Sequence, residues 1–283
     1  MPPKKKTQKK GPEEKDVEMK ADDTAEESKP DKAEAKAKAK ATKTRERAPG
    51  LPKTGLKLYY WPATGKAQTI RLLLAEAGVE WEDVVFELED PEKNGTVYST
   101  KDSLMTHTTT ESYKAFCAKC RELGGNKAHN IPMLEMNEKF YSQSHAIYRF
   151  VARKAGLYPT KIDDGFVVDN ILARVEDARA PTYAVMMQNI TKEKFLSEEV
   201  PKHLGDLERV LGDNDFYLPG VFSLADILVF DLLHSFYVAQ VPDVLKDFPK
   251  LKGLFDRVGG REKIKSYLAS DKCAKIEKMA PLP

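Results

Sequence analysis

Cysteine is scarce in this chain, which has 3 among 283 residues, one of them isolated at Cys273. So few cysteines make no disulfide framework and fit a reducing compartment. Long apolar runs are also missing, since even the stretch 224–233 is interrupted by Asp226 and Asp231. A helix spanning a membrane needs about 18 to 20 apolar residues in a row, and the first residues lack the apolar core of a secretory signal. We expect a soluble cytoplasmic protein.

Aromatic residues are absent from residues 1–54, where Lys, Glu, Ala and Pro dominate. Such a segment buries too little apolar surface to offset its chain entropy, so we predict a disordered tail. The tail has 16 Lys and Arg against 11 Asp and Glu, whereas residues 55–283 have 30 against 33. A cationic arm on a mildly acidic body is expected to bind polyanions weakly, for example RNA, acidic protein tails or anionic membrane surfaces. The alternative is a solubilising tail.

The pattern from residue 55 onward is typical of a small α/β domain that we place at 55–157. A strand at 56–60 is followed by a helix that ends near Gly78, a second strand at 81–88, a hairpin at 131–141 and a helix from Ser144 to Gly156. The polar segment at about 89–125 reads as an insertion, with a short helical pattern at 115–123. This order of elements predicts a sheet with helices packed on it.

Beyond Pro159 the signals are helical almost throughout, which predicts an all-α domain at 160–283. We expect helices at about 164–188, 193–212, 223–239 and 249–269. The third begins at Ser223-x-x-Asp226, a variant of the capping box ahead of an apolar run.

Two places in the α/β domain suit a peptide-like ligand. Ile131 precedes Pro132 at the start of a strand, and a cis bond there would turn the backbone of Ile131 outward like an unpaired sheet edge. Gln143 and Ser144 begin a helix, whose free N–H groups and dipole favour a carboxylate. An extended ligand ending in a carboxylate could lie between them.

The chain resembles the cytosolic glutathione transferases, nearest to the sigma-like group, over roughly residues 56–280. The resemblance rests on KLYYWPATGKAQTIRLLLAEAGVEWED, NIPMLEM, SQSHAIYRFVA, VVDNILARVEDA and SLADILVFDLL, which occur in the family's order. It implies a thioredoxin-like domain that binds glutathione, followed by a helical domain that supplies most of the second-substrate pocket and much of a homodimer contact. It also implies detoxification chemistry, in which the enzyme activates the glutathione thiol for conjugation or isomerisation of a small apolar electrophile.

The resemblance also implies roles for individual residues. Tyr60 matches the family's catalytic tyrosine at the end of the first strand, whereas Tyr59 points to the other face. A phenol that donates to the glutathione sulfur stabilises the thiolate. The backbone of Ile131, with Pro132 beside it, matches the site that pairs with the cysteinyl unit. Gln143 and Ser144 match the pair that holds the γ-glutamyl carboxylate, and Asp169 matches a residue that reaches the neighbouring subunit's γ-glutamyl amine.

The chain departs from the family in two ways. The segment between the second strand and Pro132 is longer by roughly two dozen residues, so only candidates can be named for the glycyl carboxylate: Lys119, Arg121 and Lys127. Lys66 stands where many members have an arginine that assists the thiolate. A lysine keeps the positive charge of that arginine but lacks its planar, forked guanidinium.

Two alternatives remain open. Cys117-x-x-Cys120 could bind zinc or do redox work, but a thioredoxin dithiol follows the first strand, and a zinc site would need two more ligands, with His107 and His129 the only near ones. We therefore expect no metal site. The second alternative is a catalytically weak interaction module of a translation or cytoskeletal assembly, which the lysine-rich tail and the insertion favour.

Overall fold

The computed structural model describes residues 50–85, 111, 114, 115, 117, 118 and 131–282. These residues belong to one compact unit. The predicted strand pattern is confirmed by a four-stranded sheet built from β1 (Leu56–Tyr60), β2 (Trp81–Val85), β3 (Met133–Met136) and β4 (Lys139–Tyr141). The strand order is β2-β1-β3-β4, with β1 and β2 parallel and the other pairs antiparallel.

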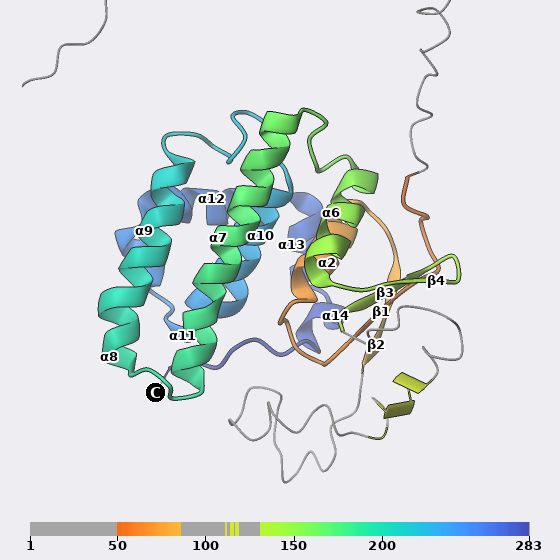
Figure 1. Cartoon of the computed structure of the whole chain (residues 1–283), viewed down its shortest axis with the longest axis horizontal. Helices are drawn as coiled ribbons and strands as arrows, with labels where there is room; N and C mark the ends of the chain where they lie inside the picture. Colours follow the sequence, from red (N-terminus) through yellow and green to blue (C-terminus); the bar gives the residue numbers. More distant parts are fainter. Residues whose placement is uncertain (1–49, 86–110, 112–113, 116, 119–130, 283) are drawn as a thin grey trace, which may run out of the picture. The chain divides into compact units, whose positions relative to one another are not determined.

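Two helices pack beside the sheet (Figure 1). The first is α2 (Gln68–Glu76), which ends at Ala77 before Gly78 takes a left-handed φ of +65°, as the sequence predicts. The second is α6 (Ser144–Ala155), whose end at the left-handed Gly156 was also predicted. Between them in sequence, Asn137 and Glu138 both have positive φ and form the tight turn from β3 to β4.

The remaining elements are helical, as predicted, and in Figure 1 they lie beside α2 and α6. They are α7 (Ile162–Met186), α8 (Lys192–Lys194), a π-helical turn (Phe195–Glu199), α9 (Val200–Leu211), α10 (Leu224–Leu232), a second π-helical turn (Leu233–Tyr237), α11 (Val238–Gln240), a 3₁₀ turn (Val244–Asp247), α12 (Pro249–Gly259), α13 (Glu262–Leu268) and α14 (Asp271–Ala274). The capping box that begins α10 forms as expected. The Ser223 side chain accepts from a backbone N–H in the first turn, and the Asp226 side chain accepts from the backbone N–H of Ser223.

One helix prediction is wrong in its extent. The single helix expected at 249–269 is two helices, α12 and α13, separated at Gly260 and Arg261. Arg261 has an extended ψ of 130°, and its guanidinium lies 3.7 Å from the centre of the Phe222 ring and pairs with Glu76 of α2. The break falls on the Gly259-Gly260 pair, since glycine weakens a helix, and the tertiary contacts of Arg261 hold the chain where α13 begins.

A buried polar contact joins the sheet's helices to the helical region. Thr69 of α2 donates its hydroxyl hydrogen to Asp231 of α10 over 2.6 Å, and both side chains are fully buried. Around this contact a continuous apolar core extends through both regions. None of the helices in the described part is long and apolar enough to cross a bilayer. The placement of the domain boundary between 157 and 160 stays a prediction.

Candidate functional site

Tyr60 ends β1, and its hydroxyl oxygen accepts a hydrogen bond from the backbone N–H of Lys66 over 3.1 Å. Its neighbour Tyr59 lies on the other face of the sheet, where it packs on Met133 and donates to Glu135 over 2.5 Å. The alternation of side chains along a strand separates the two phenols in this way. This bond uses a lone pair of the Tyr60 oxygen, so the O–H hydrogen is still available for donation to a ligand.

The turn after β1 is shaped by a glycine. Gly65 has a φ of +39°, and a Cβ built on it would lie 2.4 Å from the Tyr60 hydroxyl oxygen. Real Cβ atoms do not approach so closely, so only glycine lets this turn fold over the Tyr60 ring.

The Tyr60 hydroxyl is held in its neutral form. Burial raises the pKa of Tyr60 above the ordinary value, and the Lys66 N–H, Arg179 and Arg71 offset part of that rise. Desolvation disfavours the charged phenolate, whereas donors and cations favour it. Tyr60 is therefore a protonated donor at neutral pH.

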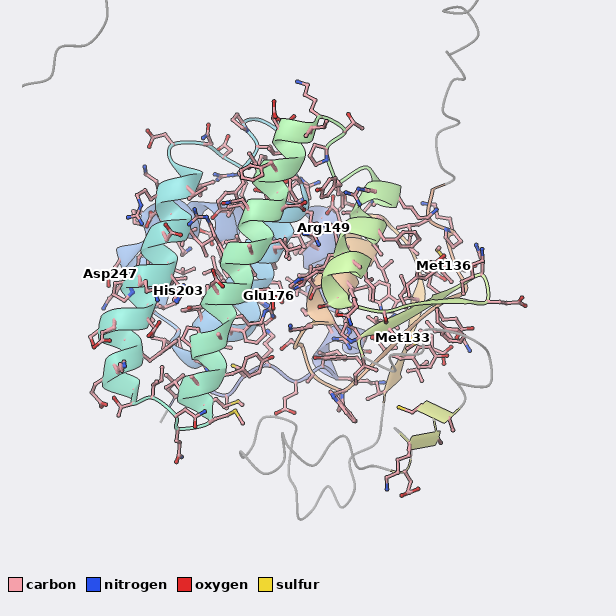
Figure 2. The ribbon with its side chains drawn as sticks, viewed as in Figure 1. Met133, Met136, Arg149, Glu176, His203 and Asp247 are labelled. Carbon is pink, nitrogen blue, oxygen red and sulfur yellow. The ribbon has the colours of Figure 1, made fainter. Side chains whose placement is uncertain are left out.

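Lys66 is fixed by both its backbone and its side chain. Its carbonyl oxygen accepts the hydroxyl hydrogen of Tyr148 over 2.6 Å, and its Nζ lies 3.0 Å from Oε2 of Glu176. Glu176 comes from α7, and Figure 2 shows it between that helix and α6. The Lys66 ammonium is therefore paired with a carboxylate at the loop.

Glu176 gathers three cationic or ionisable partners. Besides Lys66, its Oε1 lies 3.2 Å from His145 Nε2 and 3.3 Å from Arg179 Nε. Burial opposes ionisation of Glu176, but its contacts with His145, Arg179 and Lys66 lower its pKa to about 2. This carboxylate connects the turn after β1 with the first turn of α6.

The first turn of α6 has an unusual entry. Gln143 has a φ of +70° and is exposed, whereas Ser144 is buried. The buried hydroxyl oxygen of Ser142 has no hydrogen-bond partner among the described residues. N–H groups in the first turn of a helix lack intrahelical acceptors and suit an anion.

Ile131 and Pro132 precede β3, and the bond between them is cis. Pro132 is buried and Ile131 is half-buried. The register pairs Tyr59 with Met133, so these residues lie near the end of β1 that carries Tyr60.

Asp169 of α7 is held within its own chain. Arg149 donates to it over 2.8 Å and Tyr158 over 2.9 Å, while its side chain is 41% exposed. Figure 2 shows Arg149 on α6. The structure thus brings Tyr60 and Lys66 into contact. Glu176 links Lys66 to His145, the neighbour of Ser144 in α6. Asp169 belongs to a different cluster, with Arg149 and Tyr158. Its reach into a second subunit stays a prediction.

Sequence reasoning missed Glu176, Arg179 and Tyr148. The only local signal was the spacing of Glu176 and Arg179, three residues apart on a helical segment. Nothing local pairs them with the turn after β1.

Several candidates lie outside the described residues: Lys119, Arg121, Lys127, Cys120, His107 and His129. In the part of the chain that is described, no group of three or more His, Cys, Asp or Glu side chains is placed to hold a metal ion.

The larger clefts found among the described residues lie away from Tyr60. One of about 320 Å³ lies between α7 and α9 and has a charged lining that includes Arg174 and Asp206. The other, about 560 Å³, is bordered by Trp81, Tyr267 and Lys272. Neither includes Tyr60, Lys66 or Ser144 in its lining.

Comparison with known proteins agrees with this fold. A family model described as glutathione S-transferase, C-terminal domain, matches residues 176–271. Glutathione S-transferase P 2 of Bufo bufo is 30% identical over 226 residues, which are 77% of this chain and 94% of that protein. The chain therefore belongs to the glutathione S-transferase family, and it matches glutathione S-transferases over most of its length.

Solved structures show the same architecture. The Pi-class glutathione S-transferase of Onchocerca volvulus superimposes with a TM-score of 0.63 at 22% identity, covering 78% of this chain and 95% of that one. The prostaglandin synthase D of Nilaparvata lugens gives a TM-score of 0.59 at 22% identity, covering 76% and 98%. At these identities the likeness concerns the fold, a thioredoxin-like sheet domain followed by the family's helical domain.

Proposed function

We propose that this chain is a glutathione transferase in which Tyr60 activates the thiol of glutathione for attack on a small apolar electrophile, by conjugation or isomerisation. The observation that carries the proposal is the Tyr60 hydroxyl: it is neutral, accepts the Lys66 N–H, and keeps its own hydrogen for a ligand sulfur. A charge-assisted hydrogen bond contributes about 1.5 to 3 kcal/mol. Lowering a thiol pKa of about 8.5 by two units requires about 2.7 kcal/mol. One or two such bonds therefore suffice.

The other parts of glutathione are assigned to residues near Tyr60 and to the start of α6. The backbone of Ile131, beside Pro132, pairs with the cysteinyl unit, and Gln143 with Ser144 receives the γ-glutamyl carboxylate at the start of α6. Asp169 completes the neighbouring subunit's site in a homodimer. We place the protein in the cytoplasm and nearest the sigma-like group, with the tail as a weak binder of polyanions.

The test combines retention on immobilised glutathione with a conjugation assay using a generic aryl halide. We expect retention and turnover together. Failure to bind glutathione would contradict the proposal.

A second function is favoured by one observation. The Lys66 ammonium is paired with Glu176 at 3.0 Å, so the cation that stands in the arginine position is partly neutralised. A glutathione-binding interaction module with little turnover would fit this pairing. Retention on immobilised glutathione without conjugation would select that function.

A further inference from the structure

Arg179 is a fully buried arginine of α7 whose guanidinium faces the turn after β1. Its Nη1 donates to the carbonyl oxygen of Gly65 over 3.3 Å, and its guanidinium carbon lies 4.5 Å from the centre of the Phe236 ring. Glu176 lies 3.3 Å from Nε and Asp231 lies 3.9 Å from Nη2. Two carboxylates thus balance a charge that would otherwise be costly to bury.

The carbonyl of Gly65 and the N–H of Lys66 belong to one peptide group. In a trans peptide these two groups point in opposite directions. Arg179 therefore binds one edge of this peptide, and the Tyr60 hydroxyl oxygen binds the other edge over 3.1 Å. Hydrogen bonds in such a chain polarise one another, so a cation on the carbonyl makes the N–H a stronger donor.

We propose that Arg179 is a positioning residue for Tyr60: through the Gly65–Lys66 peptide it fixes and polarises the N–H that bonds the Tyr60 hydroxyl, which strengthens donation from that hydroxyl to a thiolate. This inference rests on the proposed function. The charged groups that act on Tyr60 agree with it, since the effects that lower its pKa against burial are the Lys66 N–H, then Arg179, then Arg71, with Asp231 opposing them.

Arg71 offers a matched comparison. It is also fully buried, and its Nη1 donates to a carbonyl of the same turn, that of Ala63, over 2.9 Å. The N–H of that peptide belongs to Thr64 and bonds the carbonyl of Glu277 over 2.8 Å. Arg71 therefore holds the turn through a peptide that leads to the C-terminal segment and not to Tyr60.

The experiment measures the thiol pKa of bound glutathione, from the pH dependence of kcat/KM and from the ultraviolet absorbance of the thiolate. For Arg179→Gln we expect the thiol pKa to rise by about 0.5 to 1 unit, which lowers kcat/KM near neutral pH about three- to tenfold. Activity should recover at high pH, where the thiol ionises unaided, and KM for glutathione should change little. Arg179→Lys, which keeps the charge, should restore part of the shift.

The controls separate this role from a structural one. Arg71→Gln should shift the thiol pKa clearly less. Arg257→Gln removes an arginine of α12 that pairs with Asp215, and it should not shift the thiol pKa. The proposal is overturned if Arg179→Gln titrates like the wild type, or if Arg71→Gln shifts the thiol pKa as far.

A second variant covers a failure of Arg179→Gln to fold. Glu176→Gln removes a carboxylate that pairs with both Arg179 and Lys66, so it is made in a Lys66→Met background, which keeps the Lys66 N–H. In that background it should lower the thiol pKa, the opposite sign to Arg179→Gln. A rise or no change in this variant would overturn the proposal. If the wild-type protein binds glutathione without lowering its thiol pKa, both the proposed function and this inference are wrong. If the wild type lowers the thiol pKa but the variants have the same thiol pKa as the wild type, only the role of Arg179 is wrong.

Discussion

Gly65 lies so close to Tyr60 that a Cβ added to it would be 2.4 Å from the Tyr60 hydroxyl oxygen. The turn after β1 and the candidate catalytic phenol are therefore packed as one unit. A change at either residue is expected to move the other.

The Gly65→Ala variant tests this packing. We expect both a loss of stability and a loss of conjugation, because the methyl group must displace the Tyr60 ring or the turn. Gly55→Ala is the matched control, since Gly55 has a φ of +80° but no described atom within 4 Å of an added Cβ. It should show only the backbone cost of about 1 kcal/mol. Urea unfolding and the conjugation assay would measure the difference, and equal effects in the two variants would contradict the packing argument.

Removing the Tyr60 hydroxyl should affect chemistry more than binding. We expect Tyr60→Phe to lower conjugation about ten- to a hundredfold, the equivalent of one charge-assisted hydrogen bond, with glutathione affinity nearly unchanged. Tyr59→Phe should have little effect on turnover, because its hydroxyl bonds Glu135 on the other face of the sheet. Steady-state kinetics of both variants would decide, and an equal loss in the two would show that Tyr60 has no special role.

Asp169→Ala tests whether this residue serves a second subunit. If it does, the variant should bind glutathione more weakly while remaining folded, and a monomeric form should share the defect. The structure supplies a competing explanation, because Arg149 and Tyr158 both bond Asp169. Tyr158→Phe is the control, since it removes one of these bonds and leaves the carboxylate. Calorimetry with sedimentation would separate the two explanations, and a fully active stable monomer would remove Asp169 from the site.

Glu176 should give the protein a pH-dependent stability. Its pKa is lowered from 4.5 in the free side chain to about 2 in the fold. A lowered carboxyl pKa contributes stability that is present above the unfolded value and is lost as the pH falls through the folded one. We expect a contribution of about 3 kcal/mol at neutral pH, lost between about pH 4.5 and pH 2.

Urea unfolding of wild type and Glu176→Gln at several pH values would measure this contribution. The stability difference between them should be largest near neutral pH and shrink toward pH 2. Asp247→Asn is the control, because Asp247 is an exposed carboxylate away from the site and is labelled in Figure 2. A difference between wild type and Glu176→Gln that does not depend on pH would contradict the assignment.

The tail can be removed at a point that the structure indicates. Leu51 packs against the core, and the carbonyl of Lys53 accepts the N–H of Glu80 over 2.8 Å, so the deletion should end before Leu51. We expect removal of residues 1–49 to leave the melting temperature and conjugation unchanged and to abolish salt-sensitive association with polyanions. Binding to an RNA homopolymer at low and high salt would measure this. A truncated protein that loses conjugation, or that still binds RNA, would contradict this interpretation of the tail.

The sequence by itself determined the helices and strands and the face of the sheet on which Tyr60 lies. Alternation in 56–60 placed Tyr59 and Tyr60 on opposite faces, and the Ser223-x-x-Asp226 spacing predicted the start of α10. These features depend on backbone periodicity and on hydrogen bonds between residues a few positions apart, which a sequence displays directly.

Only the tertiary structure decided what surrounds Tyr60. Arg179 and Gly65 are 114 positions apart, and their contact exists because α7 packs against the turn after β1. The same holds for Glu176 with Lys66, and for Arg261, which contacts Glu76 and Phe222. Contacts at this separation depend on how helices and sheet pack together, and no local pattern of residues encodes that packing.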